Sequence, residues 1–129
     1  MVLRLDGLSD GEVTLRQQFD LRGSLVRRVW QDAALQPADH PRLGYATLRV
    51  EVDLLGSPVW ERWFAADGSP STAVRGFASH RVLRDLHRNI IEESWLDADG
   101  EPTPNADGCA RVERTFSGPE RWVSEVCHP

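Results

Sequence analysis

Residues 45–64 decide the fold, and they read YATLRVEVDLLGSPVWERWF. Residues 45–52 alternate with a period of two, which is typical of a β-strand with one buried face. Residues 59–64 are rich in aromatic and other strand-forming side chains. Between them, Asp53-Leu54-Leu55-Gly56 fits a type I turn followed by a glycine in the left-handed region, a common hairpin loop with a bulge. This stretch therefore predicts a β-hairpin.

The hairpin is one copy of a repeat that runs through the chain. Four glycines mark the copies, 33, 32 and 32 residues apart, and 19 residues after each glycine stands a tryptophan or, in the last copy, a cysteine. These residues are Gly11, Gly44, Gly76 and Gly108, followed by Trp30, Trp63, Trp95 and Cys127. The copies span approximately residues 11–43, 44–75, 76–107 and 108–129 of a single domain, 1–129.

Such a period predicts stacked repeats. We expect an all-β fold of about eight antiparallel strands in four tandem hairpins, arranged as an elongated twisted sheet. The alternative is a small closed barrel, if the two ends of the sheet meet.

The turn type also predicts which side chains share a face of the sheet. With the bulge of the turn alone, residues of like parity lie opposite each other on the two strands. One face of the second hairpin is then mostly apolar, and we expect it to be the core: Ala46, Leu48, Val50, Val52, Pro58, Trp60, Arg62 and Phe64. The other face carries Tyr45, Thr47, Arg49, Glu51, Val59, Glu61 and Trp63. A slip of one residue would exchange the two faces.

Residues 95–112 resemble a known group of repeats. They contain WLDADGEP (residues 95–102) and NADGCARV (residues 105–112). This phrase resembles bacterial tandem repeats that read aromatic–aromatic–Asp–x–x–Gly–x–Pro, then Gly–x–Ala, then Tyr–Asp–x–x–Gly–Asn, the MORN-variant and YD-type β-hairpin arrays. The resemblance covers roughly residues 11–127, and the chain departs from it at Arg88, in the first linker and in the last turn. It implies scaffolding or recognition, and it carries over no catalytic residue.

An aromatic row is the candidate binding site. Stacked repeats would place Trp30, Trp63 and Trp95 in a ladder, with Tyr45 and Phe77 beside them. Aromatic rings bind sugar rings and attract cations through their quadrupole. The row therefore predicts a surface for a ligand or a partner. The alternative is that the linkers fold over the row and make it a second small core.

Two other groups of residues are better explained by structure than by chemistry. The acids between Asp97 and Asp107 fail the calcium-loop pattern, because its sixth and twelfth positions hold Pro102 and Gly108. We expect these acids to form turns, and we expect no metal. His80 is expected to be a buried, hydrogen-bonded residue of the core.

Three glutamates recur at equivalent positions of the repeat, with arginines on the facing strands. They are Glu61, Glu93 and Glu125, facing Arg49, Arg81 and Arg111. This pattern predicts cross-strand charge pairs. Cys109 and Cys127 are expected to be free thiols that fill apolar space. The alternative is a disulfide that closes the terminal hairpin.

The composition excludes several classes of function. The chain has 15 basic and 20 acidic residues, for a net charge of −5, and every basic residue is arginine. Without lysine, Schiff-base chemistry and P-loop phosphate binding are ruled out. An acidic balance without charge blocks speaks against nucleic acid and membrane partners. With neither a long apolar stretch nor a signal peptide, we expect a soluble, cytoplasmic protein without a cofactor.

We therefore expect a non-catalytic recognition or scaffold module that binds another protein, such as an accessory or immunity-type subunit. The contact would use an open face or a sheet edge, and the edge strands also predict pairing into a homodimer. Two alternatives stay open. One is a carbohydrate or a cationic small molecule stacked on the aromatic row. The other is an enzyme with a site in a barrel mouth around His80 and a glutamate.

Overall fold

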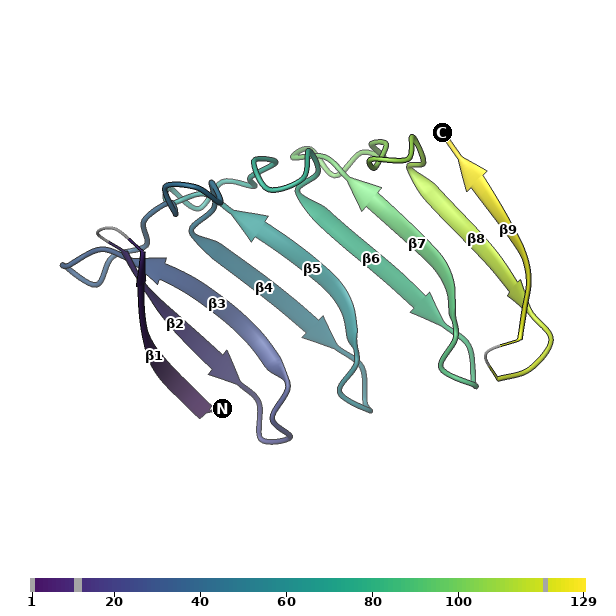
Figure 1. The fold of residues 1–129 in the computed structure, drawn as a ribbon, viewed down its shortest axis with the longest axis horizontal. Helices are drawn as coiled ribbons and strands as arrows, with labels where there is room; N and C mark the ends of the chain where they lie inside the picture. The colour runs from purple at the N-terminus through teal and green to yellow at the C-terminus, as the bar shows by residue number, and fades with distance from the viewer. Residues whose placement is uncertain (1, 11–12, 120) are drawn as a thin grey trace.

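The computed structural model describes residues 2–10, 13–119 and 121–129, and only the backbone of residues 2–10. The strands form one antiparallel sheet, in which each strand pairs with its neighbours in the chain (Figure 1). They are β1 (Val2–Asp10), β2 (Val13–Phe19), β3 (Leu25–Gln31), β4 (Thr47–Val52), β5 (Pro58–Phe64), β6 (Ser79–Arg84), β7 (Ile90–Leu96), β8 (Arg111–Phe116) and β9 (Trp122–His128). The sheet runs from β1 to β9 without closing, so the open array is confirmed and the barrel is excluded.

Eight of these strands form the four hairpins that the repeat predicted. They are β2–β3, β4–β5, β6–β7 and β8–β9, and long linkers join them along one side of the sheet (Figure 1). The strand β1 was not predicted, because it precedes the first copy of the repeat; it pairs antiparallel with β2. None of the described residues lies in a helix, so that part of the chain has no helix able to cross a membrane.

The hairpin turns use the aspartates that the sequence singled out. In the second hairpin, the Asp53 carboxylate accepts hydrogen bonds from the backbone N–H groups of Leu55 and Ser57, at 3.0 Å each. Gly56 has the predicted positive φ, 84°. The third hairpin keeps the same turn, with Arg88 in place of glycine at φ 69°. An ion pair of 2.8 Å to Asp53 of the preceding turn holds the Arg88 side chain.

A second bulge beyond each turn decides which residues face each other. In the second hairpin, Val52 pairs with Pro58 but Glu51 pairs with Trp60, so Val59 has no partner on β4. The same residue is skipped in every hairpin: Val26, Val59, Ile91 and Val123. Because one extra residue reverses the parity of the pairing, the predicted faces are wrong for most of each strand.

The core lies on one face of the sheet, to which both strands of each hairpin contribute side chains. Leu48 lies opposite Trp63, although the sequence had placed them on different faces. The core comprises Val13, Leu15, Trp30, Tyr45, Leu48, Val50, Trp63, Phe77, Trp95, Cys109 and Val112. Ala38 and Val74, from two linkers, pack against this cluster. We call this side of the sheet the linker face.

The correction moves three of the eight predicted core residues to the other side of the sheet. Leu48 and Val50 are buried in the core as expected. Trp60, Arg62 and Phe64 lie on the opposite face, because they alternate with Trp63 along β5.

Candidate functional site

On the face opposite the linkers, which we call the arginine face, Arg111 of β8 pairs with carboxylates, and five other arginines form a group. They come from five neighbouring strands, β2 to β6: Arg16, Arg27, Arg49, Arg62 and Arg81. Arg27 lies directly opposite Arg49, and Arg49 lies directly opposite Arg62. Because neighbouring strands are about 4.8 Å apart, three guanidinium-bearing side chains stand in one row across β3, β4 and β5.

Most of these charges are not neutralised by the chain itself. Arg62 forms an ion pair of 2.9 Å with Glu51. Within residues 13–119 and 121–129, no carboxylate forms an ion pair with Arg16, Arg27, Arg49 or Arg81. Burial, and then the charges of Arg49 and Arg16, lower the pKa of Arg27. Like charges on directly opposite residues destabilise a sheet, so this row does not serve the stability of the fold.

Aromatic rings lie among the arginines. The guanidinium carbons of Arg62 and Arg81 lie 4.3 and 4.6 Å from the centre of the Trp60 ring. That of Arg49 lies 5.4 Å from the centre of the Phe64 ring. A guanidinium stacked in this way keeps the N–H groups at its edge available for an anion.

Several donors on this face lack an acceptor. The buried Nε atoms of Arg16, Arg27 and Arg62 and the indole Nε1 of Trp60 have no hydrogen-bond partner among the described residues. Leaving a buried donor unsatisfied costs about 1–3 kcal/mol. Because these atoms are buried, they do not themselves form a binding site for a ligand on this face.

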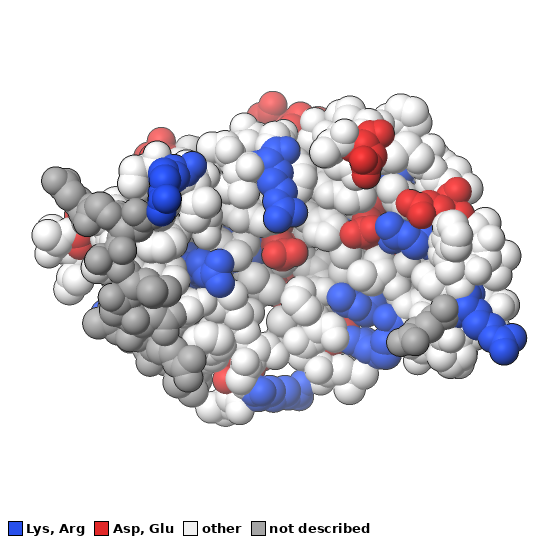
Figure 2. Space-filling model, viewed as in Figure 1, with Lys and Arg blue, Asp and Glu red and all other residues white. Residues whose placement is uncertain are grey.

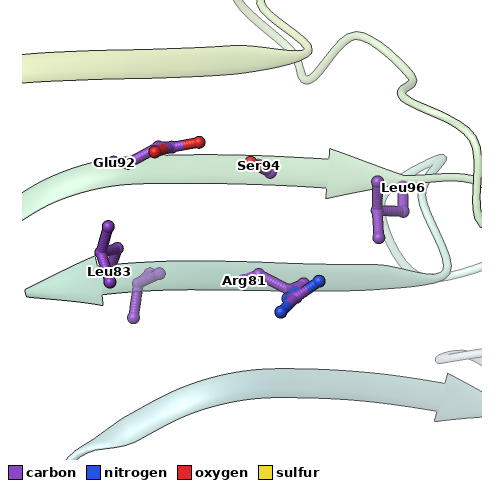
Figure 3. Close-up of a pocket in the computed structure, with 6 residues that line it drawn as sticks. Arg81, Leu83, Glu92, Ser94 and Leu96 are labelled. Atoms are coloured by element: carbon purple, nitrogen blue, oxygen red, sulfur yellow. The ribbon is translucent and has the colours of Figure 1, made fainter.

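A hollow of about 320 Å³ lies next to the arginine row (Figure 3). Arg81 and Leu83 border it from β6, and Glu92, Ser94 and Leu96 border it from β7. Arg81 lies opposite Ser94, and Leu83 lies opposite Glu92. Leu83 is 53% exposed, so the hollow offers apolar surface with one cationic side chain and one carboxylate.

The linker face carries a second polar row, in which the charges are paired. The His80 ring lies 3.0 Å from the Glu93 carboxylate and 3.6 Å from that of Glu61. Arg114 lies 2.7 Å from Glu93 and 3.8 Å from Glu125. The row thus alternates in sign across β5 to β9. In the view of Figure 2, blue and red side chains likewise adjoin one another, without a broad region of one sign.

The paired row keeps His80 protonated. Burial alone would lower the pKa of His80, but the hydrogen bonds and charges of Glu61 and Glu93 outweigh it and raise the pKa to about 9. The hydrogen bond from His80 and the charge of Arg114 together lower the pKa of Glu93 despite its burial. A protonated histidine between two ionised carboxylates has no lone pair to accept a proton, so at neutral pH this cluster is a set of ion pairs.

These contacts confirm one expectation and correct another. His80 is hydrogen-bonded on the core side of the sheet as expected, with its side chain half-buried. The predicted partners of the glutamates are wrong, because Arg49, Arg81 and Arg111 lie on the arginine face. Arg111 instead pairs with two carboxylates of that face, Glu92 and Glu113, at 3.8 and 3.0 Å.

The predicted aromatic site lies in the core. Trp30, Trp63, Trp95, Tyr45 and Phe77 are 3–9% exposed. Trp63 and Phe77 pack edge to face, with ring centres 5.8 Å apart, and Trp30 packs against His40 of the first linker at 4.5 Å. The burial agrees with the alternative in which linkers fold over the row. The site prediction is therefore corrected in one respect: a ligand could stack on these rings only after the linkers had moved.

The two cysteines form a disulfide, against the expectation of free thiols. Cys127 occupies the tryptophan position of the repeat and is linked to Cys109 of the same hairpin. The bond fastens β9, the last strand of the sheet, to the segment before β8.

The acids of the third linker form turns, as predicted. Asp97 Oδ1 accepts hydrogen bonds from the backbone N–H groups of Asp99 and Glu101, at 2.9 Å each. Asn105 Oδ1 does the same for Asp107 and Cys109. The part of the chain that the structure describes holds no group of three or more side chains able to bind a metal ion.

The arginine face was missed because three of its residues, Trp60, Arg62 and Phe64, had been assigned to the core by parity. With opposite parity, Arg49, Trp60 and Arg62 fall on one face. Comparison of the chain with known protein families, with curated proteins and with solved structures found no match. The kinship with MORN-variant and YD-type repeats stays a prediction.

Proposed function

We propose that the chain is a non-catalytic recognition module that binds another protein through its arginine face. The observation that carries the proposal is the row of Arg27, Arg49 and Arg62, which lie directly opposite one another with a single carboxylate, Glu51, as an ion-pair partner within the described residues. Such a row costs stability when the protein is alone. A partner with negative charge would remove that cost on binding.

The alternative of a stacked carbohydrate is not pursued, because no exposed aromatic row supports it. The five aromatic side chains on which it depended are buried beneath linkers. Trp60 is on the arginine face, but two guanidinium groups lie over its ring.

Site-specific photocrosslinking tests the proposal. Leu83 is 53% exposed on the arginine face, and Leu35 is 59% exposed in the first linker. We expect p-benzoylphenylalanine at position 83 to give one discrete protein adduct in the source cells. Position 35 should not give it, and the added substitution Arg49→Glu should abolish it. The same adducts from both positions, or an adduct that ignores Arg49→Glu, would contradict the proposal.

The outer edge of β9 supports a second contact, between two copies of the chain. Backbone N–H groups at the repeat tryptophans bond to the next hairpin: Trp30 to Ala46, Trp63 to Ala78, Trp95 to Ala110. Cys127 holds the same position at the end of the sheet, so its N–H and that of Glu125, two residues earlier, face outward. Trp122, Val123 and Val126 of this strand are 50–60% exposed. An apolar strand edge of this kind pairs readily with another strand.

Proline at position 125 tests this homodimer. It removes an outward N–H group while leaving the β8–β9 ladder intact. We expect sedimentation equilibrium to show a dimer for the native chain and for Glu125→Gln, and a monomer for Glu125→Pro. A monomer in all three cases would contradict the second contact and leave the arginine face untouched.

A further inference from the structure

The charge of the arginine face also defines what kind of partner segment it fits. We infer that the partner presents an extended acidic segment whose carboxylates lie along the row of Arg27, Arg49 and Arg62. This inference rests on the proposed function and adds the chemistry of the partner to it.

The length of the face suits a short extended segment. The arginines occupy five neighbouring strands, from Arg16 on β2 to Arg81 on β6. With strands about 4.8 Å apart, the face measures about 19 Å across the strands, which an extended chain of about six residues would span. The segment would therefore cross the strands instead of adding to an edge.

A carboxylate from this chain already shows how the face binds an anion. Glu51 reaches the guanidinium of Arg62 at 2.9 Å. Arg27 and Arg49, in the same row, have no such partner within the described residues. Guanidinium groups bind carboxylates through two parallel N–H bonds, so the vacant positions match the side chains of aspartate and glutamate.

The aromatic rings of this face argue against nucleic acid as the occupant. Proteins that bind single strands stack bases on open aromatic rings. Here the guanidinium groups of Arg62 and Arg81 lie over the Trp60 ring, and that of Arg49 lies over the Phe64 ring. The net charge of −5 also repels a long polyanion that extends beyond the five arginines.

The hollow beside the row places the apolar part of the segment. Leu83 and Leu96 border it, so it accepts an apolar side chain (Figure 3). Glu92 also borders it and repels a carboxylate there. The acidic part of the segment therefore lies over β3 to β5, and an apolar residue next to it enters the hollow between β6 and β7.

Fluorescence anisotropy with short labelled peptides tests the inference. The probe is a peptide of five glutamates followed by leucine; one comparison peptide replaces the glutamates by glutamine, and another replaces the leucine by glycine. We expect the first to bind, the glutamine peptide not to bind, and the glycine peptide to bind less tightly.

Two variants make the test specific to the row. Arg49→Gln should weaken binding about tenfold, since charge-assisted hydrogen bonds are lost. Arg75→Gln, an exposed arginine of the second linker, is the matched control and should leave the affinity unchanged. Thermal melting of both variants shows that they are folded.

Several results would overturn the inference. They are equal binding of the glutamine peptide, equal affinities of the two variants, the absence of any binding, or tighter binding of a single-stranded oligothymidylate than of the glutamate peptide. If one of these results is found while the photocrosslinked adduct at position 83 persists, the module still binds a protein through this face. Only the inference that the partner presents an acidic segment is then wrong. If the adduct is also absent, the proposed function fails with it.

Discussion

Two polar rows cross the same sheet on opposite faces, and they are built in opposite ways. On the linker face, His80 and Arg114 lie between Glu61, Glu93 and Glu125, so each positive group has two carboxylates. On the arginine face, the five arginines of β2 to β6 have one carboxylate as an ion-pair partner among the described residues, Glu51, which pairs with Arg62. The ion pairs of the linker face hold the strands together by themselves. The arginine face reaches a comparable balance of charge only when an anion from outside the chain binds to it.

The difference shows that the repeat can use one face of the sheet to stabilise the fold and the other face to bind a partner. Both rows cross neighbouring strands about 4.8 Å apart, so the spacing of the strands does not distinguish them. The sign of the charges distinguishes the two rows. Opposite charges on neighbouring strands contribute a few tenths to about 1 kcal/mol per pair, and like charges oppose folding by a similar amount.

The linker-face row should make stability depend on pH. The pKa of His80 is raised from 6.5 to about 9 on folding, so the folded state binds the proton more tightly. The resulting stability, about 3 kcal/mol, is fully present below pH 6.5 and is lost as the pH rises through 9. Urea unfolding of the native chain across this range measures it.

The variant His80→Gln is the control for this loss of stability. It removes the titrating group, so its free energy of unfolding should vary far less over the same pH range. No lysine titrates nearby to obscure the comparison, because the chain has none. An equal decline in the variant and the native chain would show that His80 is not the group responsible.

Removal of Glu93 should weaken the fold. Glu93→Gln leaves His80 and Arg114 each with one remaining carboxylate, at 3.6 and 3.8 Å. We expect a loss of about 2 kcal/mol, less than for a fully buried pair. Glu113→Gln is the matched control on the arginine face, where the side chain is 46% exposed, and it should cost less than about 0.5 kcal/mol. Equal losses in chemical denaturation would remove the distinction between the faces.

The arginine row should respond in the opposite direction. The double variant Arg27→Gln, Arg49→Gln removes like charges from directly opposite positions, so its free energy of unfolding should stay equal or rise by up to about 1 kcal/mol. The same double variant should lose affinity for the glutamate peptide. A loss of stability greater than about 1 kcal/mol would show that the row supports the fold.

Salt should raise the stability of the native chain slightly, in the same direction as removal of the arginine charges. Raising the concentration of sodium chloride from about 0.05 M to about 0.5 M shortens the screening length and weakens the repulsion between the exposed arginines. Stability of the native chain should increase by a few tenths of a kcal/mol at pH 7, and the double variant should lack this increase. A decrease in the native chain would mean that attraction dominates at its exposed charges.

The sequence predicted the hairpins well and their faces poorly, for a physical reason. Alternation in residues 45–52 and the Asp53–Gly56 turn are local signals, and both were confirmed. The bulge at Val59 has no such signal, because a β-branched residue fits a paired strand and a bulge alike. The position of the bulge depends on which side chains the linkers cover. The one extra residue, Val59, places Trp60 and Arg62 outside the predicted core.

The remaining errors have a similar origin. The strand β1 lacks a partner copy within the repeat, so periodicity could not reveal it. The Cys109–Cys127 bond could not be derived from parity, because Cys127 lies opposite Val112 and Cys109 reaches it from the segment before β8. The candidate site could not be predicted as a whole, because a row of arginines on neighbouring strands exists only once the register is known.

Nuclear magnetic resonance of the arginine Nε–H groups tests the central claim most directly, since one spectrum reports on both faces. The glutamate peptide is added to the isotope-labelled protein, and each arginine resonance is followed. The account predicts that Arg27, Arg49 and Arg62 shift in a saturable manner while Arg114, already paired with Glu93 and Glu125, does not. Shifts at Arg114 with none in the row, or no saturable shift at all, would contradict it.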